Sequence, residues 1–410
     1  MKRATYRFFS PCTVRAAMMM KNGTNLHITP RARVVANTMG RTRSMVSVPA
    51  LTDKTRELAD KLLSDDDDDD NEANHLQRRF ALSRAITLLE STNEERAMEA
   101  EGLLAHLLQQ RASSKSLRIG IAGPPGAGKS TMIEALGKYL LDPPPHLWDD
   151  DEDSKSTTAN LWFPKRLGVL CIDPSSHRTG GSILGDKTRM TDLSVHPRAF
   201  VRPTPSAGHL GGLAAATDQV VRLYGAAGYD LAIIETVGLG QSEVEVAESV
   251  DLTILLVPPA GGDDLQGIKR GILEIADLVV VTKADGELKH AAQRTAADYQ
   301  GSLQFLSRPG ESPPPVMLAS SQTGQGLADI WQHVVDLAHR RQAAGKLDKR
   351  RREQRHYWMW KSLQMLVELK TRRDPNLAET AQALKHELDL GHLSPRLAAT
   401  ELLRVLSEEK

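Results

Sequence analysis

A glycine-rich stretch near residue 125 has the residue types and spacing needed to bind phosphate groups. It fits the P-loop pattern G-x-x-x-x-G-K-[ST] without a mismatch, follows an apolar run at 117–122 and precedes a helical pattern at 131–141. Its glycines let backbone N–H groups face phosphate oxygens, and the start of the helix adds partial positive charge. We expect Lys129 to reach the β- and γ-phosphates and Ser130 to bind Mg2+. The expected phosphate-binding residues are Gly123, Pro124, Pro125, Gly126, Ala127, Gly128, Lys129, Ser130 and Thr131.

A second motif indicates which base the nucleotide carries. Thr282-Lys283-Ala284-Asp285 follows an apolar run and resembles the guanine-binding N-K-x-D motif, with threonine in place of asparagine. The Asp285 carboxylate can accept hydrogen bonds from the ring N–H and the amino group of guanine. Adenine has neither donor there, so a buried acceptor would stay unpaired at a cost of about 1–3 kcal/mol. We therefore expect GTP and GDP, with the stem of Lys283 over the base and a loop of Ser320, Ser321 and Gln322 closing on its other side.

Candidate magnesium-binding and catalytic residues follow other apolar runs. Glu235 ends the run 231–235 and is followed by x-x-Gly, which is typical of a Walker B strand whose glycine, here Gly238, senses the γ-phosphate. Glu235 can bind Mg2+ directly or through water. Asp173 also follows a strand pattern, and Asp186 lies in a glycine-rich stretch that we expect to order around the γ-phosphate and Mg2+. Either aspartate is a candidate to position Mg2+ or the attacking water, and the sequence does not separate their roles.

The sequence contains no evident residue that positions the attacking water unaided. Gly238 is not followed directly by glutamine, and Gln241 lies three residues further on. We therefore expect slow intrinsic hydrolysis that a partner accelerates, because a supplied group can add roughly 10³–10⁵ in rate. A second glycine-rich segment, 261–269, ends with Lys269; by itself its sequence favours an ordinary surface loop.

The middle of the chain alternates short apolar runs with helical patterns. The runs are mostly apolar and do not alternate between apolar and polar residues, as is typical of strands buried on both faces. This order predicts an α/β fold, a P-loop NTPase with a doubly wound, mostly parallel sheet. The expected strands are Leu117–Ala122, Leu167–Ile172, Ala199–Arg202, Leu231–Glu235, Leu252–Val257, Leu278–Thr282 and Val316–Ala319, and the segments Asp142–Ala159 and Arg308–Pro315 are expected surface insertions.

Helical patterns flank this central region on both sides. A helix is expected from about His75 to Glu90, with Phe80, Leu82, Ile86 and Leu89 as its apolar set. Ser91 or Asn93 could cap a second helix, whose leucines are Leu103, Leu104, Leu107 and Leu108. The chain is helical again from about residue 345. We expect its basic cluster, Lys349–Arg352 with Arg355, to be a solvated face rather than a nucleic-acid surface.

Composition excludes several classes of protein. Among the 410 residues, 52 Lys and Arg balance 52 Asp and Glu, which argues against a dedicated nucleic-acid binder. Two cysteines, Cys12 and Cys171, exclude a disulfide scaffold. No run approaches the roughly 18 apolar residues of a membrane span, so we expect no stable membrane insertion.

The charge distribution indicates how the chain is divided. Residues 1–52 contain nine Lys and Arg and no acidic residue, the composition of a mitochondrial transit peptide; a disordered basic tail is the alternative. The acidic run Asp65–Asp70 should be disordered. We expect a transit peptide at 1–52, an acidic linker and helical region at 53–115, a P-loop domain at 116–343 and a helical region at 344–410.

These motifs together resemble the MeaB-type GTPases. The resemblance covers roughly residues 75–410 and leaves the basic leader and the acidic run uncovered. The two insertions depart from the family pattern but fall where loops are expected. The resemblance is seen in the stretches Gly123–Ser130, Asp173–Met190, Arg202–Gly212, Glu235–Glu243, Gly261–Gly271 and Thr282–Gly286, with Ala85–Thr92 and Trp358–Trp360 outside the nucleotide-binding core.

The resemblance implies a function and partners. It implies a GTP-hydrolysing chaperone in the mitochondrial matrix that gates adenosylcobalamin loading and protects or reactivates methylmalonyl-CoA mutase. The implied partners are that mutase, the cobalamin adenosyltransferase and a second copy of the chain. The implied catalytic set is Lys129, Asp173, Asp186 and Lys269, with Lys269 in a partner-responsive switch, and the implied metal set is Ser130, Asp173, Asp186 and Glu235. Trp360, Leu363, Leu366 and Val367 would form the dimerisation stripe, and packing against the chain's own core is the alternative.

Other functions remain open at this stage. A nickel-delivery GTPase would favour a His-rich tract or paired Cys and His ligands, whereas the 13 histidines of this chain are scattered. A kinase would transfer phosphate to an acceptor other than water, and the guanine motif argues against it.

Overall fold

The computed structural model describes residues 48–64, 72–91, 93–111, 116–144, 162–173, 190–205, 210–236, 245–259, 270–306 and 312–408. The chain divides into two compact units, residues 1–115 with 225–228, and residues 116–224 with 229–410. Several sequence predictions concern residues outside this description: the leader as far as residue 47, the acidic run, Asp186, Gly238, Lys269, most of the insertion Asp142–Ala159 and half of the insertion Arg308–Pro315. None of the helices described has the length and apolar character that a membrane crossing requires.

In the described residues of the first unit, three helices pack on one another: α2 (Asp53–Leu63), α3 (Glu72–Leu89) and α4 (Glu94–Gln110). Of the two candidate caps for α4, Asn93 fills the position, because its side chain accepts a hydrogen bond from the backbone N–H of Arg96. Sequence analysis did not predict α2 as a helix. Its buried residues, Thr55, Ala59 and Leu62, nevertheless recur at helical spacing.

The apolar face of α3 differs from the predicted one. Leu82 and Ile86 are fully buried as expected, together with Ala85. The inclusion of Phe80 was wrong, since 66% of its surface is exposed. The reason is geometric: successive residues of a helix are separated by about 100°, so the buried stripe of Ala81, Leu82, Ala85 and Ile86 turns Phe80 away from the packed face.

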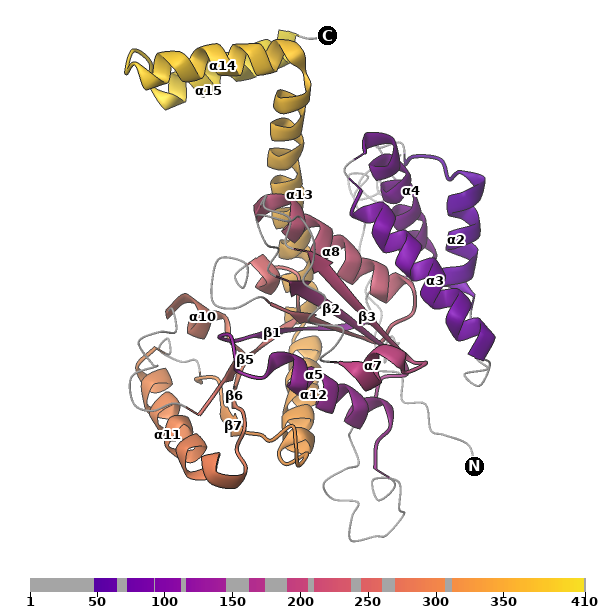
Figure 1. The fold of residues 1–410 in the computed structure, drawn as a ribbon, viewed down its shortest axis with the longest axis vertical. Coiled ribbons are helices and arrows are strands. Elements are labelled where there is room, and N and C mark those ends of the chain that lie inside the picture. Colours follow the sequence, from indigo (N-terminus) through magenta and orange to yellow (C-terminus); the bar gives the residue numbers. More distant parts are fainter. Residues whose placement is uncertain are drawn as a thin grey trace, which may run out of the picture. The chain divides into compact units, whose positions relative to one another are not determined.

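The second unit is built on seven parallel strands in the order β3-β2-β4-β1-β5-β6-β7 (Figure 1). The strands are β1 (Leu117–Ala122), β2 (Leu167–Asp173), β3 (Ala199–Pro205), β4 (Leu231–Glu235), β5 (Leu252–Val257), β6 (Leu278–Val281) and β7 (Val316–Leu318). This confirms the predicted doubly wound sheet. The chain passes from β1 over β4 to reach β2, and later returns to the other side of β1. Ligands of such sheets bind where the strand order reverses, at the carboxyl ends of the strands.

Burial along the strands explains why they appear as continuous apolar runs. Every residue of β1, β4, β5 and β6 is buried, whereas the edge strand β7 is only partly buried. Apolar residues of α10 and α11 pack with β5 and β6 into one core cluster. The helices that the structure describes in this region are α5 (Lys129–Leu141), α7 (Thr191–Val195), α8 (Leu210–Ala226), α10 (Arg270–Ile275), α11 (Lys289–Leu306) and α12 (Leu327–Ala343), with a 3-10 turn, η5 (Gly286–Leu288).

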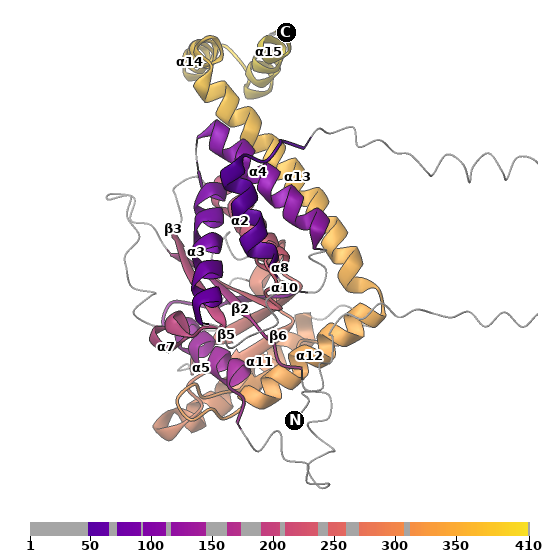
Figure 2. The same cartoon turned by 90° about the vertical axis from the view of Figure 1, so that its right-hand side faces the viewer.

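The carboxyl-terminal region consists of helices joined by short turns up to residue 408. Helix α13 (Lys346–Arg373) follows α12 and leads to α14 (Pro375–Asp389) and α15 (Pro395–Glu408). Figures 1 and 2 show α14 and α15 side by side at the end of α13 that is distant from the sheet. Asp374 begins α14 by accepting hydrogen bonds from the N–H groups of Asn376 and Leu377. The apolar side chains of Trp360, Leu363 and Leu366 on α13 are exposed, so they do not pack against the core of the same chain.

One face of the first half of α13 packs on the sheet domain through polar contacts. Two guanidinium nitrogens of Arg351 each lie 2.7 Å from an oxygen of Asp251, and Arg351 also donates to the Ser116 carbonyl at 2.6 Å. Arg351 is 5% exposed and Asp251 is fully buried, so the prediction of a solvated basic face was wrong for this residue. Burial acts to raise the pKa of the Asp251 carboxyl, but Arg351 outweighs it and the pKa lies below its usual value.

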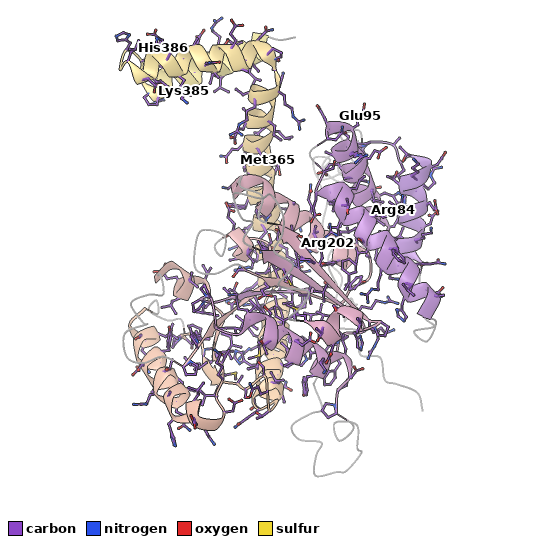
Figure 3. The ribbon with its side chains drawn as sticks, in the orientation of Figure 1. Arg84, Glu95, Arg202, Met365, Lys385 and His386 are labelled. Carbon is purple, nitrogen blue, oxygen red and sulfur yellow. The ribbon has the colours of Figure 1, made fainter. Side chains whose placement is uncertain are left out.

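Further donors of α13 contact backbone carbonyls beside Asp251. They hold the short segment 247–250 and supply hydrogen bonds to its backbone carbonyls. Arg350 donates to the carbonyls of Val250 and Ala247, Gln354 to that of Val250, and Trp358 to that of Glu248. Met365, labelled in Figure 3, packs with Tyr357 against Trp358.

Candidate nucleotide-binding site

The phosphate loop joins β1 to α5 at the centre of the sheet. Gly123 follows β1 directly, and a Cβ atom on it would lie 2.4 Å from the Leu256 carbonyl oxygen, so no side chain fits there. Gly128 has φ +83°, a left-handed conformation, and occupies the cap position of α5. The loop therefore presents its backbone beside the first turn of α5, where the helix dipole favours an anion.

Lys129 and Ser130 form the start of α5, and both side chains are largely buried. The Lys129 ammonium group donates to the carbonyls of Gly123 at 2.9 Å and Pro124 at 3.2 Å. It therefore lies against the backbone of the phosphate loop. The remaining predicted phosphate-binding residues are placed around it: Ala127 is buried, and Pro125, Gly126 and Thr131 are exposed.

The Ser130 hydroxyl is directed at the carboxylate that ends β4. Ser130 Oγ donates to Glu235 Oε1 at 2.7 Å, and the two residues are each 5% exposed. Asp173 ends β2 on the neighbouring strand, where Cys171 is in register with Glu235. Asp173 is two residues further along β2, so it lies at the same carboxyl edge of the sheet as Glu235. The described residues thus place a hydroxyl and a carboxylate, both oxygen donors of the kind that Mg2+ prefers, in one buried position.

The base-binding loop is attached directly to the phosphate loop. Thr282 Oγ1 donates to the Ala127 carbonyl at 2.8 Å, and the Lys283 ammonium group donates to the Gly126 carbonyl at 3.0 Å. Lys283 is the one residue other than glycine with positive φ in the described part of the chain, at 53°. This left-handed conformation is uncommon for a side-chain-bearing residue and marks a constrained turn after β6.

Asp285 is oriented by the loop that follows β7. Ser320 Oγ donates to Asp285 Oδ2 and accepts from the Thr323 N–H at 3.1 Å, while Ser320 itself is fully buried. Ser321 lies near α5, since its hydroxyl is 3.8 Å from the sulfur of Met132. Gln322 is exposed. Ser320 thus holds Asp285, the residue predicted to bind guanine, by a hydrogen bond to its carboxylate.

Most of the predicted site residues meet at the carboxyl edge of the sheet. The phosphate loop, Glu235, the base-binding loop and Ser320 are connected by hydrogen bonds. Asp173 lies at the same edge, and Asp186, Gly238 and Lys269 fall outside the described residues. Sequence analysis missed the contact between Thr282 and Ala127. The threonine was visible as a substitution in the motif, but its partner is 155 residues away.

The geometry of a P-loop joined to a guanine-type base loop agrees with a comparison against protein families. The model of the family described as "Methylmalonyl Co-A mutase-associated GTPase MeaB" matches residues 82–144 and 160–376. The chain belongs to this family of GTPases. As a MeaB-family GTPase it binds guanine nucleotide and hydrolyses GTP to GDP and phosphate.

Individual relatives of this MeaB-family chain come from animals and bacteria. The mouse protein named "Methylmalonic aciduria type A homolog, mitochondrial" is 40% identical over 363 residues, which cover 86% of this chain and 81% of the relative. The "GTPase ArgK" of Escherichia coli is 40% identical over 284 residues, 69% of this chain and 79% of the relative. The solved structure titled "Crystal structure of LAO/AO transport system kinase" covers 88% of this chain and 100% of its own, with a TM-score of 0.61 and 27% identity.

Proposed function

We propose that this MeaB-family GTPase is a chaperone of adenosylcobalamin-dependent methylmalonyl-CoA mutase. In this proposal it gates adenosylcobalamin loading and protects or reactivates the mutase. The observation that carries the proposal is the match to a family described as mutase-associated over residues 82–144 and 160–376. That match includes the sheet, the nucleotide site and α13 through residue 373, so it extends beyond the phosphate loop shared by many nucleotide-binding proteins.

Mg2+ is the proposed metal of the site. Ser130, Glu235, Asp173 and Asp186 would hold it; the buried approach of Ser130 Oγ to Glu235 Oε1 fits a site for a hard cation. A bound Mg2+ would neutralise charge on the β- and γ-phosphate oxygens. In hydrolysis, the phosphate loop and Lys129 would bind those oxygens, Gly238 would contact the γ-phosphate, and Asp173 or Asp186 would orient water.

The mutase would accelerate GTP hydrolysis, which is slow in the chain alone. No glutamine follows Gly238 directly, and Gln241 is three residues further on. Lys269 would belong to a switch that responds to the mutase, and the cobalamin adenosyltransferase would be a second partner. A group supplied or repositioned by a partner can raise hydrolysis by roughly 10³–10⁵.

A homodimer is the proposed assembly, with α13 as its arm. Trp360, Leu363 and Leu366 expose 60%, 49% and 59% of their surfaces, and Val367 is partly buried beside them. Large apolar side chains at this spacing form a stripe along one side of a helix. An exposed stripe of this kind is typical of an interaction surface, which favours dimerisation over packing against the chain's own core.

The mitochondrial matrix is the proposed location. The nine basic residues of the acid-free segment 1–52 support this, as do the mouse and Caenorhabditis elegans relatives, whose names describe them as mitochondrial. The alternative of metal delivery has no observation in its favour: among the described residues no group of three or more His, Cys, Asp or Glu side chains is placed to hold a metal.

The proposed function is tested by measuring phosphate release from GTP by the full chain, with and without methylmalonyl-CoA mutase. We expect slow release that the mutase accelerates, and no release from ATP. The Lys129→Ala variant is the matched control, because it should lose turnover both alone and with the mutase. GTP hydrolysis that is indifferent to the mutase would reject the chaperone role while leaving the GTPase assignment intact.

A further inference from the structure

Thr282 occupies the position where the guanine motif usually has asparagine, and its hydroxyl group is engaged within the protein. Thr282 Oγ1 lies 2.8 Å from the Ala127 carbonyl oxygen and 3.3 Å from the Val257 carbonyl oxygen, and the residue is 2% exposed. A hydroxyl group has a single proton to donate. Both neighbours are acceptors, so that proton is directed to the backbone of the protein.

The backbone around Thr282 strengthens the same connection. The Thr282 N–H donates to the Val257 carbonyl at 2.9 Å, which anchors the loop to the end of β5. The next residue, Lys283, donates to the Gly126 carbonyl at 3.0 Å. Two consecutive residues of the base-binding loop therefore hold two consecutive carbonyls of the phosphate loop, Gly126 and Ala127.

Asparagine at this position would have different chemistry. Its amide group has two N–H donors, so it could donate one to the phosphate loop and the other to a purine. Guanine presents N7 as an acceptor on the edge opposite its amino group. Threonine has no second donor for N7 once its hydroxyl proton is directed at Ala127.

We propose that Thr282 is a positioning residue that joins the base-binding loop to the phosphate loop and does not read N7 of the purine. Guanine is then selected on its other edge, by the Asp285 carboxylate that Ser320 orients. The inference rests on guanine-nucleotide binding and is independent of the role at the mutase. It predicts that Thr282 contributes equally to the binding of any nucleotide with the guanine Watson–Crick edge.

The test compares GDP with 7-deaza-GDP, in which a C–H group replaces N7. Dissociation constants for both are measured on the full chain and on Thr282→Val, Thr282→Ser and Thr282→Asn. We expect Thr282→Val to weaken both nucleotides by the same factor, about tenfold, because it leaves a buried carbonyl without its donor. Thr282→Ser keeps the hydroxyl and should bind both within about twofold of the wild type, since its donor is retained.

The asparagine variant supplies the positive control for N7 recognition. Thr282→Asn should prefer GDP over 7-deaza-GDP by about fivefold more than the wild type does, the value of one modest hydrogen bond. Thermal unfolding of each variant checks that it is folded. If the valine variant is unstable, Thr282→Asn keeps the test valid, because a wild type that already reads N7 would gain no preference for GDP from the asparagine.

Two results would overturn the proposal. If Thr282→Val removes a preference for GDP over 7-deaza-GDP that the wild type shows, then Thr282 reads N7. If Thr282→Val binds both nucleotides as tightly as the wild type, then the contact with Ala127 does not position the loops. A preference shared equally by the wild type and Thr282→Val would place N7 recognition on another residue and support the proposal.

Discussion

Ser130 Oγ donates to Glu235 Oε1 at 2.7 Å, although the two residues are 105 positions apart in the chain. Ser130 lies in the first turn of α5, directly after the phosphate loop, and Glu235 is the last residue of β4. They meet because β4 is the hydrogen-bonded neighbour of β1. The strand order of the sheet thus brings a P-loop hydroxyl to a Walker B-type carboxylate.

This relationship predicts that loss of either side chain impairs magnesium-dependent turnover. Ser130→Ala and Glu235→Gln should each lower the rate of GTP hydrolysis, by about a hundredfold, and raise the Mg2+ concentration needed for half-maximal activity. The reason is that each variant removes one oxygen donor from the proposed cation site. Phosphate release measured over a magnesium titration checks this.

The matched control is nucleotide affinity in the presence of EDTA. Because the two side chains are proposed to act through Mg2+, GDP binding without the metal should change little in either variant. A large loss of GDP affinity in EDTA, with an unchanged magnesium requirement, would contradict the assignment.

Asp285 is predicted to set base preference. Asp285→Asn should weaken GTP binding by about tenfold to a hundredfold, because an amide cannot accept both hydrogen bonds from guanine. The same variant should bind XTP better than the wild type does, since xanthine has a carbonyl where guanine has its amino group. Competition of each nucleotide against a fluorescent GDP analogue measures both effects.

Ser320→Ala is the paired variant for base preference. It removes the hydroxyl group that donates to Asp285 but keeps the carboxylate. We expect a loss of GTP affinity of about fivefold, as for one hydrogen bond, without a gain in XTP binding. A preference for XTP in Ser320→Ala would show that the carboxylate alone does not determine the choice of base.

The buried pair of Asp251 and Arg351 is predicted to make the sheet domain sensitive to acid. The pKa of Asp251 is lower in the folded protein than its usual value, so its stabilising contribution is complete above about pH 4 and is lost as pH falls further. Asp251→Asn should reduce the free energy of unfolding by about 3–5 kcal/mol at pH 7, because it leaves the buried charge of Arg351 without its carboxylate counterion. Urea unfolding between pH 3 and pH 7 compares the two proteins.

The difference between wild type and Asp251→Asn should shrink below about pH 4, because the unfolded wild-type chain then takes up a proton on Asp251 that the folded chain binds only at lower pH. Glu353→Gln serves as the control, since Glu353 and Lys349 form an exposed pair at 3.8 Å on the same helix. An exposed pair contributes little to stability, so this variant should unfold like the wild type. Equal effects of the two substitutions would count against a special role for the buried pair.

The exposed stripe of α13 is predicted to support the dimer. Trp360→Glu should raise the dimer dissociation constant by at least about thirtyfold, because a buried tryptophan is a frequent energetic centre of an interface. Sedimentation velocity over a range of protein concentrations measures this. Arg372→Glu changes an exposed residue of the same helix outside the stripe and should leave the assembly unchanged. A wild-type chain that stays monomeric at high concentration would refute the proposed arm.

Local spacing in the sequence was sufficient to predict the phosphate loop, the guanine motif and all seven strands. The P-loop depends on glycines and a lysine within eight residues, and a strand buried on both faces is continuous in its apolar character. Local spacing also predicted the ends of α3 and α5 to within a few residues of those in the structure. These features are encoded by neighbours in the chain, so they can be read without knowing the fold.

Only the tertiary structure decided which distant residues meet. The pairing of Ser130 with Glu235, of Thr282 with Ala127 and of Arg351 with Asp251 depends on strand order and helix packing. Arg351 shows the reason clearly: a basic run on a helix has the same sequence whether it faces water or a buried carboxylate. Phe80 shows the converse: it is an apolar residue left exposed because it lies on the opposite side of α3 from the packed face.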